Sequence, residues 1–491
     1  MSNGLVAFSD LPVEIGELII SLCDDDGLLA LVKTNRYLNW LLIPILLRRL
    51  LQIDIQEGVI DANWCPDDPR RLRLLTLLNL WVYKPTLPTF KYTFFASSCQ
   101  RFVSQYETET IAEFLHRISS IDTLSFQCLD NLAGATSAIR KHDSDLWRLN
   151  LVALLKLALH RRCRKLMLDR GPMSTYIHEP SSSRFTAAQS KDLASITSFI
   201  NCPPTLEVLE LRDSMMLLPF FLPHTLDLLR SQSSVLVELM ICEDSLGGWK
   251  EFFASVSAPS LQQLVIKRKS FQEPFVVSFD LLFKFFHRHP ALRRIKLDHI
   301  RIPKVVTPPI ERTYLFPNLE YLDAHPTILA TLLRYPPHFP KLCYISMSLT
   351  SYDGYDRAIS VLSSELKYSM SIGTNPIPLS FAFNADKSFI SWFRRQCESP
   401  NRLQYLKDLE EITVILETTW FGEMISFLHL LPDWLAPLTN LKVVRVGHPY
   451  HIDVCRRELR NLQGMRPALK IRLFDSLNSI CGDRGLREQD L

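Results

Sequence analysis

The middle of the chain repeats one spacing of apolar residues. An apolar anchor is followed by two variable residues, an apolar residue, one variable residue and another apolar residue, as in LEVLEL at Leu206. Further copies have their anchors at Leu236, Leu261, Leu292, Leu319 and Leu342. Successive anchors are separated by 30, 25, 31, 27 and 23 residues. Apolar residues two apart predict a strand that buries one face, so each copy predicts one strand.

Weaker copies extend this pattern in both directions. They are IDTLSF at Ile121, CRKLML at Cys163, LEEITV at Leu409 and LKVVRV at Leu441, and PLSFAFN (378–384) predicts one more strand. Between the strands, segments such as SFDLLFKFFHRHP (278–290) carry apolar residues at helical spacing. Each unit is therefore predicted to be a helix followed by a strand, which gives an α/β fold with parallel strands.

Proline recurs two residues before the leucine anchor, in HPALRR, FPNLEY, FPKLCY and APSLQQ. Proline blocks helix continuation and favours an extended entry into the strand. One such unit cannot bury its own apolar face, so the units must stack into a solenoid with strands on one wall and helices on the other. The rival, a doubly wound α/β domain, requires a Gly-rich loop after a strand, and none of the 15 glycines is so arranged.

The first fifty residues carry a different pattern. In DLPVEIGELIISL, Pro12 suits a first helical turn, and Glu14 and Glu17 suit the positive end of a helix dipole. One face of this helix would carry Leu11, Ile15, Leu18, Ile19 and Leu22. DDDG (24–27) breaks the helix, and residues 28–51 predict further helices, with Pro44 opening the last. Three or four short helices cannot bury this much Leu and Ile, so we expect a partner.

Composition changes this picture little. The chain has 491 residues, which predicts two or more domains or one elongated repeat array, and its 47% hydrophobic and 22% charged residues are typical of folded proteins. A net charge of +3 gives no global field for nucleic acid or an anionic membrane. The longest apolar run, Leu41–Leu47, is far below the roughly 18 residues of a membrane span. Asp10 and Glu14 interrupt the place of a signal peptide, and eleven cysteines without a Cys-x-x-Cys pair favour the cytoplasm or nucleus.

The sequence carries no recognisable catalytic motif. There is no Walker phosphate loop, no Gly-x-Ser-x-Gly elbow, no His-Glu-x-x-His and no dinucleotide fingerprint, so we predict neither an enzyme nor a cofactor. The best metal-like cluster is His448, His451 and Cys455, with His287 and His289 elsewhere. A closed zinc site needs four ligands in paired spacing, so surface or core roles are favoured for these residues.

The variable residues of the predicted strands point away from the helices. That places a set of polar and aromatic residues on the face that would hold a substrate, namely Glu238, Lys267, Arg294, Lys296, Tyr321, His325 and Tyr344. The same reasoning adds Glu210, Arg212 and Met240. Arginine binds carboxylate and phosphate well, so an acidic or modified peptide is the predicted ligand. The alternative is a solvated strand face without a ligand.

These two patterns together resemble a known family. LPVEI, LIISL and LLALVKTNRYLNWLLIPILLRRL, covering residues 9–51, resemble an F-box, and the array behind them resembles irregular leucine-rich repeats that lack the usual Asn. The resemblance implies docking on a Skp-family adaptor, which attaches to a cullin ubiquitin ligase. It implies adaptor contacts for Leu11, Pro12, Ile15, Ile19, Leu28 and Val32. For the last four, packing inside the domain is the alternative.

The predicted organisation has four parts. An F-box-like helical domain covers 1–51, a helical linker or cap 52–118, the solenoid 119–481 and a polar tail 482–491. The function that follows is a non-catalytic adaptor that presents a protein substrate for ubiquitination. The rival function is a repeat scaffold outside any ubiquitin ligase, whose first helices only cap the array.

Overall fold

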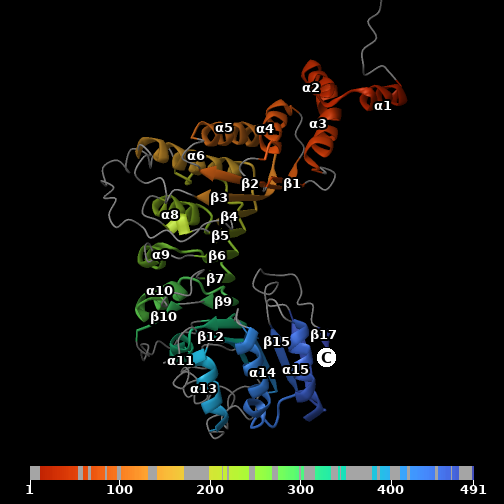
Figure 1. Cartoon of the computed structure of the whole chain (residues 1–491). Coiled ribbons are helices and arrows are strands. Elements are labelled where there is room, and N and C mark those ends of the chain that lie inside the picture. The colour runs from red at the N-terminus through yellow and green to blue at the C-terminus, as the bar shows by residue number, and fades with distance from the viewer. Residues whose placement is uncertain are drawn as a thin grey trace, which may run out of the picture. The chain divides into compact units, whose positions relative to one another are not determined.

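The computed structural model of the chain describes most of the repeated segments (Figure 1). The described residues are 12–53, 59–62, 64, 68–82, 86–96, 101–130, 141–170, 198–212, 214–217, 221–242, 249–267, 275–297, 300–303, 316–332, 341–342, 344–349, 379–383, 387–398, 410–416, 421–447, 452–465, 467–474 and 489–490. The chain forms two compact units, Met1–Leu239 and Met240–Leu491.

The first unit begins with three helices, α1 (Val13–Leu22), α2 (Asp25–Thr34) and α3 (Arg36–Leu51). The carboxylate of Asp24 accepts the Gly27 N–H at 2.8 Å, and the Asn35 side chain accepts the Tyr37 N–H at 2.6 Å. Both are N-caps, which satisfy amide donors that the first turn of a helix leaves unpaired. The α1 helix begins after Pro12, as the sequence predicted.

Two details of these helices differ from the prediction. Pro44 lies inside α3 and does not open a helix, because buried Leu42, Ile43 and Leu46 hold both sides of the proline in one continuous element. The DDDG segment (24–27) follows the end of α1 and also begins α2. Asp24 caps α2, and the residues from Asp25 onward already belong to it.

The sheet of the first unit is parallel and runs in chain order. Its strands are β1 (Val59–Ala62), β2 (Leu87–Ala96), β3 (Ile121–Asp130), β4 (Lys165–Arg170) and β5 (Val208–Arg212). Its further helices are α4 (Arg70–Leu80), α5 (Arg101–Arg117), α6 (Lys141–His160) and α8 (Leu222–Ser231), with the short 3-10 helix η3 (Ser214–Leu217). The expectation that 52–118 is helical is therefore wrong for β1 and β2, which belong to the sheet.

The second unit has the same alternation. Its parallel strands are β7 (Gln263–Lys267), β9 (Arg294–Leu297), β11 (Tyr321–Ala324), β12 (Tyr344–Leu349), β13 (Leu379–Phe383), β14 (Glu411–Leu416), β15 (Val443–Gly447) and β16 (Lys470–Phe474). Its helices are α9 (Trp249–Ser255), α10 (Phe279–His287), α11 (Pro326–Leu332), α13 (Lys387–Glu398), α14 (Phe421–Leu435) and α15 (Ile452–Met465). The strand β6 (Glu238–Cys242) spans the boundary between the units.

Two smaller pairings complete the second unit. The strands β8 (Phe275–Val276) and β10 (Ile300–Arg301) form a separate parallel pair. The strand β17 (Gln489–Asp490) pairs antiparallel with β16, so part of the predicted polar tail joins the sheet.

Apolar residues on one face of each sheet pack under the helices, which lie along that face in both units (Figure 1). In the second unit, Ile295 and Leu297 on β9 are buried, as are Leu282 and Phe285 on α10. All of the segments predicted as strands are strands, including PLSFAFN, which lies between β12 and β14. The predicted solenoid-like α/β fold is thus confirmed.

An arginine at the end of a helix recurs in both units and contacts the helix before it. Arg117 donates to the carbonyls of Leu78 and Asn79 at the end of α4, at 3.1 and 2.7 Å. Arg161 donates likewise to two carbonyls at the end of α5, those of Leu115 and His116. In the second unit, Arg288 donates to two carbonyls at and after the end of α9, those of Phe253 and Val256. Helix C-termini leave such carbonyls unpaired, so these arginines join successive helices.

A buried polar side chain next to the helix end makes a second link. Gln232, after α8, accepts the N–H groups of Thr205 and Leu206 at 2.9 and 3.0 Å. In the second unit, His289 Nε2 accepts the Ala258 N–H at 3.0 Å, so its Nδ1 carries the proton and donates to the Phe285 carbonyl. Burial lowers the pKa of His289 to about 4. This histidine is neutral and belongs to the core, as the sequence favoured.

Candidate binding surfaces

Helix α1 presents apolar side chains to solvent. Leu18 is 54% exposed and Leu22 is 78% exposed, and Ile15 also ranks among the exposed large hydrophobic residues. The three residues are three and four positions apart, so they lie on one face of the helix. Ile19 lies beside them and is half-buried. This face is the apolar stripe that the sequence pattern predicted.

Helix α3 adds two exposed aromatic residues. Trp40 is 56% exposed, and its ring centroid lies 6.3 Å from that of Tyr37, which is also exposed. We use the name N-terminal apolar surface for the exposed set on these two helices, Ile15, Leu18, Leu22, Tyr37 and Trp40. Tyrosine and tryptophan are enriched among residues that dominate protein interfaces.

The predicted adaptor-contact residues separate into two groups. Pro12, Ile15 and Ile19 are exposed or half-buried, whereas Leu11 lies outside the described residues. Leu28 and Val32 are 0% and 2% exposed, which fits the alternative of packing inside the domain. They lie in the core between α2 and α3, because a ten-residue amphipathic helix buries its apolar face against a neighbouring helix.

The second unit carries the other candidate surface, on the sheet face directed away from the helices. The register places Arg294, Tyr321 and Tyr344 side by side on β9, β11 and β12. Two positions further along the same strands, Lys296 and Asp323 are neighbours. We call these five residues the tyrosine site.

The tyrosine site is built around a stack. The rings of Tyr321 and Tyr344 are parallel within 6°, with centroids 4.8 Å apart. The Arg294 guanidinium carbon lies 5.4 Å from the centroid of Tyr321. Since β11 lies between β9 and β12, the Tyr321 ring is covered by Arg294 on one side and by Tyr344 on the other. Arg294 itself is exposed and both tyrosines are half-buried.

An ion pair lies next to the stack. Lys296 Nζ is 3.0 Å from Asp323 Oδ2, and the Asp323 side chain is almost fully buried. Burial, and then the neighbouring Asp323 charge, raise the pKa of the Tyr321 phenol. Tyr321 therefore keeps its proton at physiological pH.

Further cations lie on the same face towards β16. Arg445 on β15 bonds Glu411 on β14 and is the register neighbour of Arg472 on β16. Lys470 lies two residues before Arg472 and is exposed. We call Arg445, Lys470 and Arg472 the β16 site.

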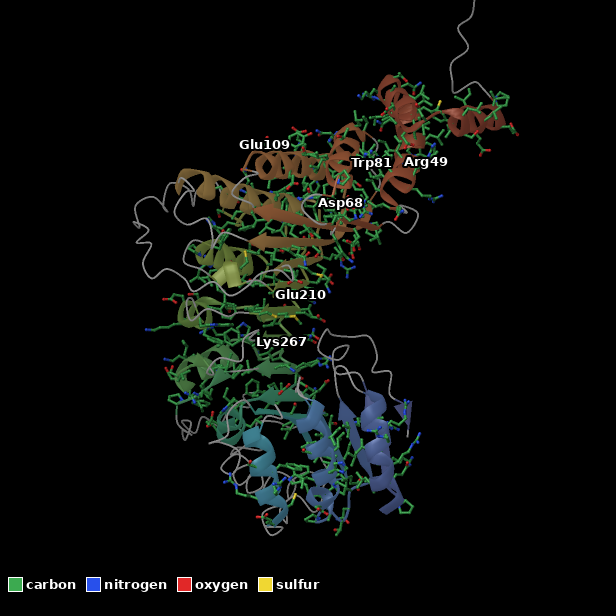
Figure 2. The ribbon with its side chains drawn as sticks, in the orientation of Figure 1. Arg49, Asp68, Trp81, Glu109, Glu210 and Lys267 are labelled. Atoms are coloured by element: carbon green, nitrogen blue, oxygen red, sulfur yellow. The ribbon has the colours of Figure 1, made fainter. Side chains whose placement is uncertain are left out.

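The other predicted substrate residues have different surroundings. Lys267 is half-buried at the end of β7 in the second unit, and Glu238 is half-buried on β6 in the first (Figure 2 labels Lys267). His325 lies between β11 and α11, directly before the first residue of that helix. It is nearly buried, and its Nδ1 accepts the Thr327 N–H at 3.2 Å, because the start of α11 needs an acceptor there.

The strand face of the first unit has a different character. Glu210 on β5 contacts Lys165 on β4 at 2.7 Å and Arg212 at 2.5 Å (Figure 2 labels Glu210). Burial alone would raise the pKa of Glu210, but hydrogen bonds and charge from the two cations outweigh it and lower that pKa. On the neighbouring strands β1 and β2, Lys91 Nζ lies 3.0 Å from Asp61 Oδ2.

A buried ion pair on the helix side of the first unit was not predicted. Arg71 on α4 contacts Glu107 on α5 at 2.5 Å, with both side chains almost fully buried. Arg71 also lies 5.8 Å from the ring centroid of Tyr92 on β2. Burial raises the pKa of Glu107 to about 7, and the Arg71 charge offsets this only in part.

Within the described ranges, no group of three or more His, Cys, Asp or Glu residues could hold a metal ion. His448 and His451 lie outside those ranges, and only the backbone of Cys455, in α15, is described. In the part of the chain that the structure describes, no helix has the length and apolar character needed to cross a membrane. No protein-family model matches the chain, and a search of curated proteins gave no significant match.

Proposed function

We propose that the chain is a non-catalytic substrate adaptor of a cullin-type ubiquitin ligase, acting in the cytoplasm or nucleus. Its N-terminal apolar surface would bind a Skp-family adaptor as an F-box does. Its strand faces would hold a protein substrate. The mechanism is bridging, which raises the effective concentration of the substrate near the ubiquitin carrier without a catalytic group from this chain.

The observation that carries the proposal is the exposed stripe Ile15, Leu18 and Leu22 on α1. Large apolar side chains on one exposed helix face typically mark a protein interface. The F-box-like sequence of residues 9–51 gives that interface its expected partner. The burial of Leu28 and Val32 fits the same proposal, since these residues hold α2 and α3 together as a platform.

Co-purification of the full chain with a Skp-family adaptor and cullin tests this proposal. The diagnostic variant is Leu18→Glu/Leu22→Glu, which changes exposed side chains and should leave the fold intact. A residue at the centre of an interface costs about 2 kcal/mol or more on truncation, so we expect this variant to lose the adaptor.

The matched control is Tyr106→Glu/Ile200→Glu, which places the same charge at exposed apolar positions on α5 and before β5. We expect the control to retain the adaptor. Binding by the diagnostic variant would overturn the assigned surface. A wild-type chain that folds but captures no adaptor would favour the repeat scaffold instead.

A further inference from the structure

The strand face of the second unit is basic. Among its described side chains, two are anionic, Asp323 and Glu411. Six are cationic, and the register and strand alternation place them together on this face: Lys267, Arg294, Lys296, Arg445, Lys470 and Arg472. The whole chain has a net charge of only +3, so this excess is local. Such a local field attracts an anionic partner.

The cations occur in two places separated by hydroxyl residues. One register row runs from Lys296 through Asp323, Ser346, Ser380 and Thr413 to Arg445. Neighbouring strands are about 4.8 Å apart, so five steps put the tyrosine site and the β16 site about 24 Å apart along the sheet. An extended peptide covers this distance with about seven residues.

The tyrosine site can accept an acidic side chain. Arg294 is exposed, and its planar guanidinium matches a carboxylate. The Tyr321 ring lies against this guanidinium, with Tyr344 on the other side of the ring, so the stack holds Arg294 in place.

We propose that this face binds an extended acidic segment of a protein, with acidic side chains at the tyrosine site and at the β16 site. This inference rests on the proposed function, because the acidic segment would be the part of the substrate that the adaptor holds.

The same stack argues against nucleic acid as the ligand. Proteins bind single-stranded nucleic acid by stacking bases on the faces of aromatic rings. Both faces of Tyr321 are already covered, by Arg294 and Tyr344. Tyr321 therefore offers no ring face to a base, and an acidic protein segment is the ligand that we propose.

Fluorescence anisotropy with the full chain tests the inference. The probe is a fluorescein-labelled peptide of about twelve glutamates, long enough to span about 24 Å, and an oligouridylate of similar length is the competing probe. The diagnostic variant is Arg294→Gln/Lys470→Gln, which changes two exposed cations of this face. The control is Lys284→Gln/Arg460→Gln, which removes the same charge from exposed positions on α10 and α15.

We expect saturable peptide binding whose Kd rises about tenfold or more in the diagnostic variant and changes less than about twofold in the control, since charge-assisted contacts are strong. Equal weakening by both variants, absence of saturable binding, or tighter binding of the oligouridylate would each overturn the inference. The assay contains no Skp-family adaptor. Acidic-peptide binding by a chain that captures no adaptor would therefore refute the proposed function while leaving the acidic-segment site in place.

Discussion

On the strand face of the first unit, charged side chains occur in sets of opposite sign, as in Asp61 with Lys91 and Glu210 with Lys165 and Arg212. On the strand face of the second unit, cations outnumber anions. Both faces arise from the same alternation of residues along parallel strands. One repeat pattern therefore produces a strand face with charges of both signs in the first unit and a strand face suited to an anionic partner in the second.

The largest expected effect concerns the buried charges of the first unit. Glu107→Leu leaves the Arg71 charge buried without its carboxylate, and we expect a loss of about 3–5 kcal/mol in the free energy of unfolding. The double variant Arg71→Met/Glu107→Leu should recover most of that loss. Urea denaturation measures the change, and hydrogen exchange should place it in α4 and α5. A double variant as unstable as the single one would show that charge is not the cause.

The same pair predicts a pH dependence. The folded pKa of Glu107, about 7, lies above its ordinary 4.5, so its contribution to stability is full below pH 4.5 and is lost as pH rises through about 7. Between these limits the loss is on the order of 3 kcal/mol. Urea denaturation of wild type and Glu107→Gln at several pH values measures it as the difference between the two chains. Parallel pH profiles would contradict the prediction.

The arginines at helix ends should contribute equally to stability in both units. The difference between the units is therefore confined to their strand faces. Arg161→Met in the first unit and Arg288→Met in the second should each lower the free energy of unfolding by about 2 kcal/mol, because each removes two hydrogen bonds from a charged donor to helix-end carbonyls. Arg230→Met, at an exposed arginine of α8, is the control and should cost less than about 0.5 kcal/mol. Chemical denaturation measures the free energy of unfolding of each variant. A loss of stability from only one of the two substitutions would contradict the prediction.

The smallest effects separate the two strand faces directly. Glu210→Gln should cost about 1 kcal/mol, since it removes a nearly buried carboxylate from two cations. Arg294→Gln should change stability by less than about 0.5 kcal/mol, because this side chain is exposed. Thermal unfolding of both variants measures the contrast. A stability loss for Arg294→Gln that equals that of Glu210→Gln would assign both faces a structural role.

The sequence predicted the repeats well because their signal is local. Each anchor and its residues two apart lie within about six positions, several copies add a proline two residues before the anchor, and every such segment is a strand. The strand β2 was missed although Phe90, Tyr92 and Phe94 alternate, because the prediction relied on aliphatic anchors and this strand packs aromatic rings.

The parts that failed depend on packing between distant segments. Pro44 lies in mid-helix because neighbouring side chains are buried, which no local rule reveals. The burial of Leu28 and Val32 depends on the approach of α3. The helix-end arginines did have a signal that was overlooked, since FLHR (114–117), ALHR (158–161) and FFHR (285–288) share a His-Arg pair at the end of a helix.

The short strand β17 has a consequence for association between chains. Two residues, Gln489 and Asp490, pair antiparallel with Leu473 and Arg472 on β16. A long unpaired edge strand is a template onto which another molecule can add its own strand, and short polar edges discourage such growth. By pairing with Arg472 and Leu473, β17 shortens the part of β16 onto which another strand could add, which discourages edge-to-edge aggregation of the second unit.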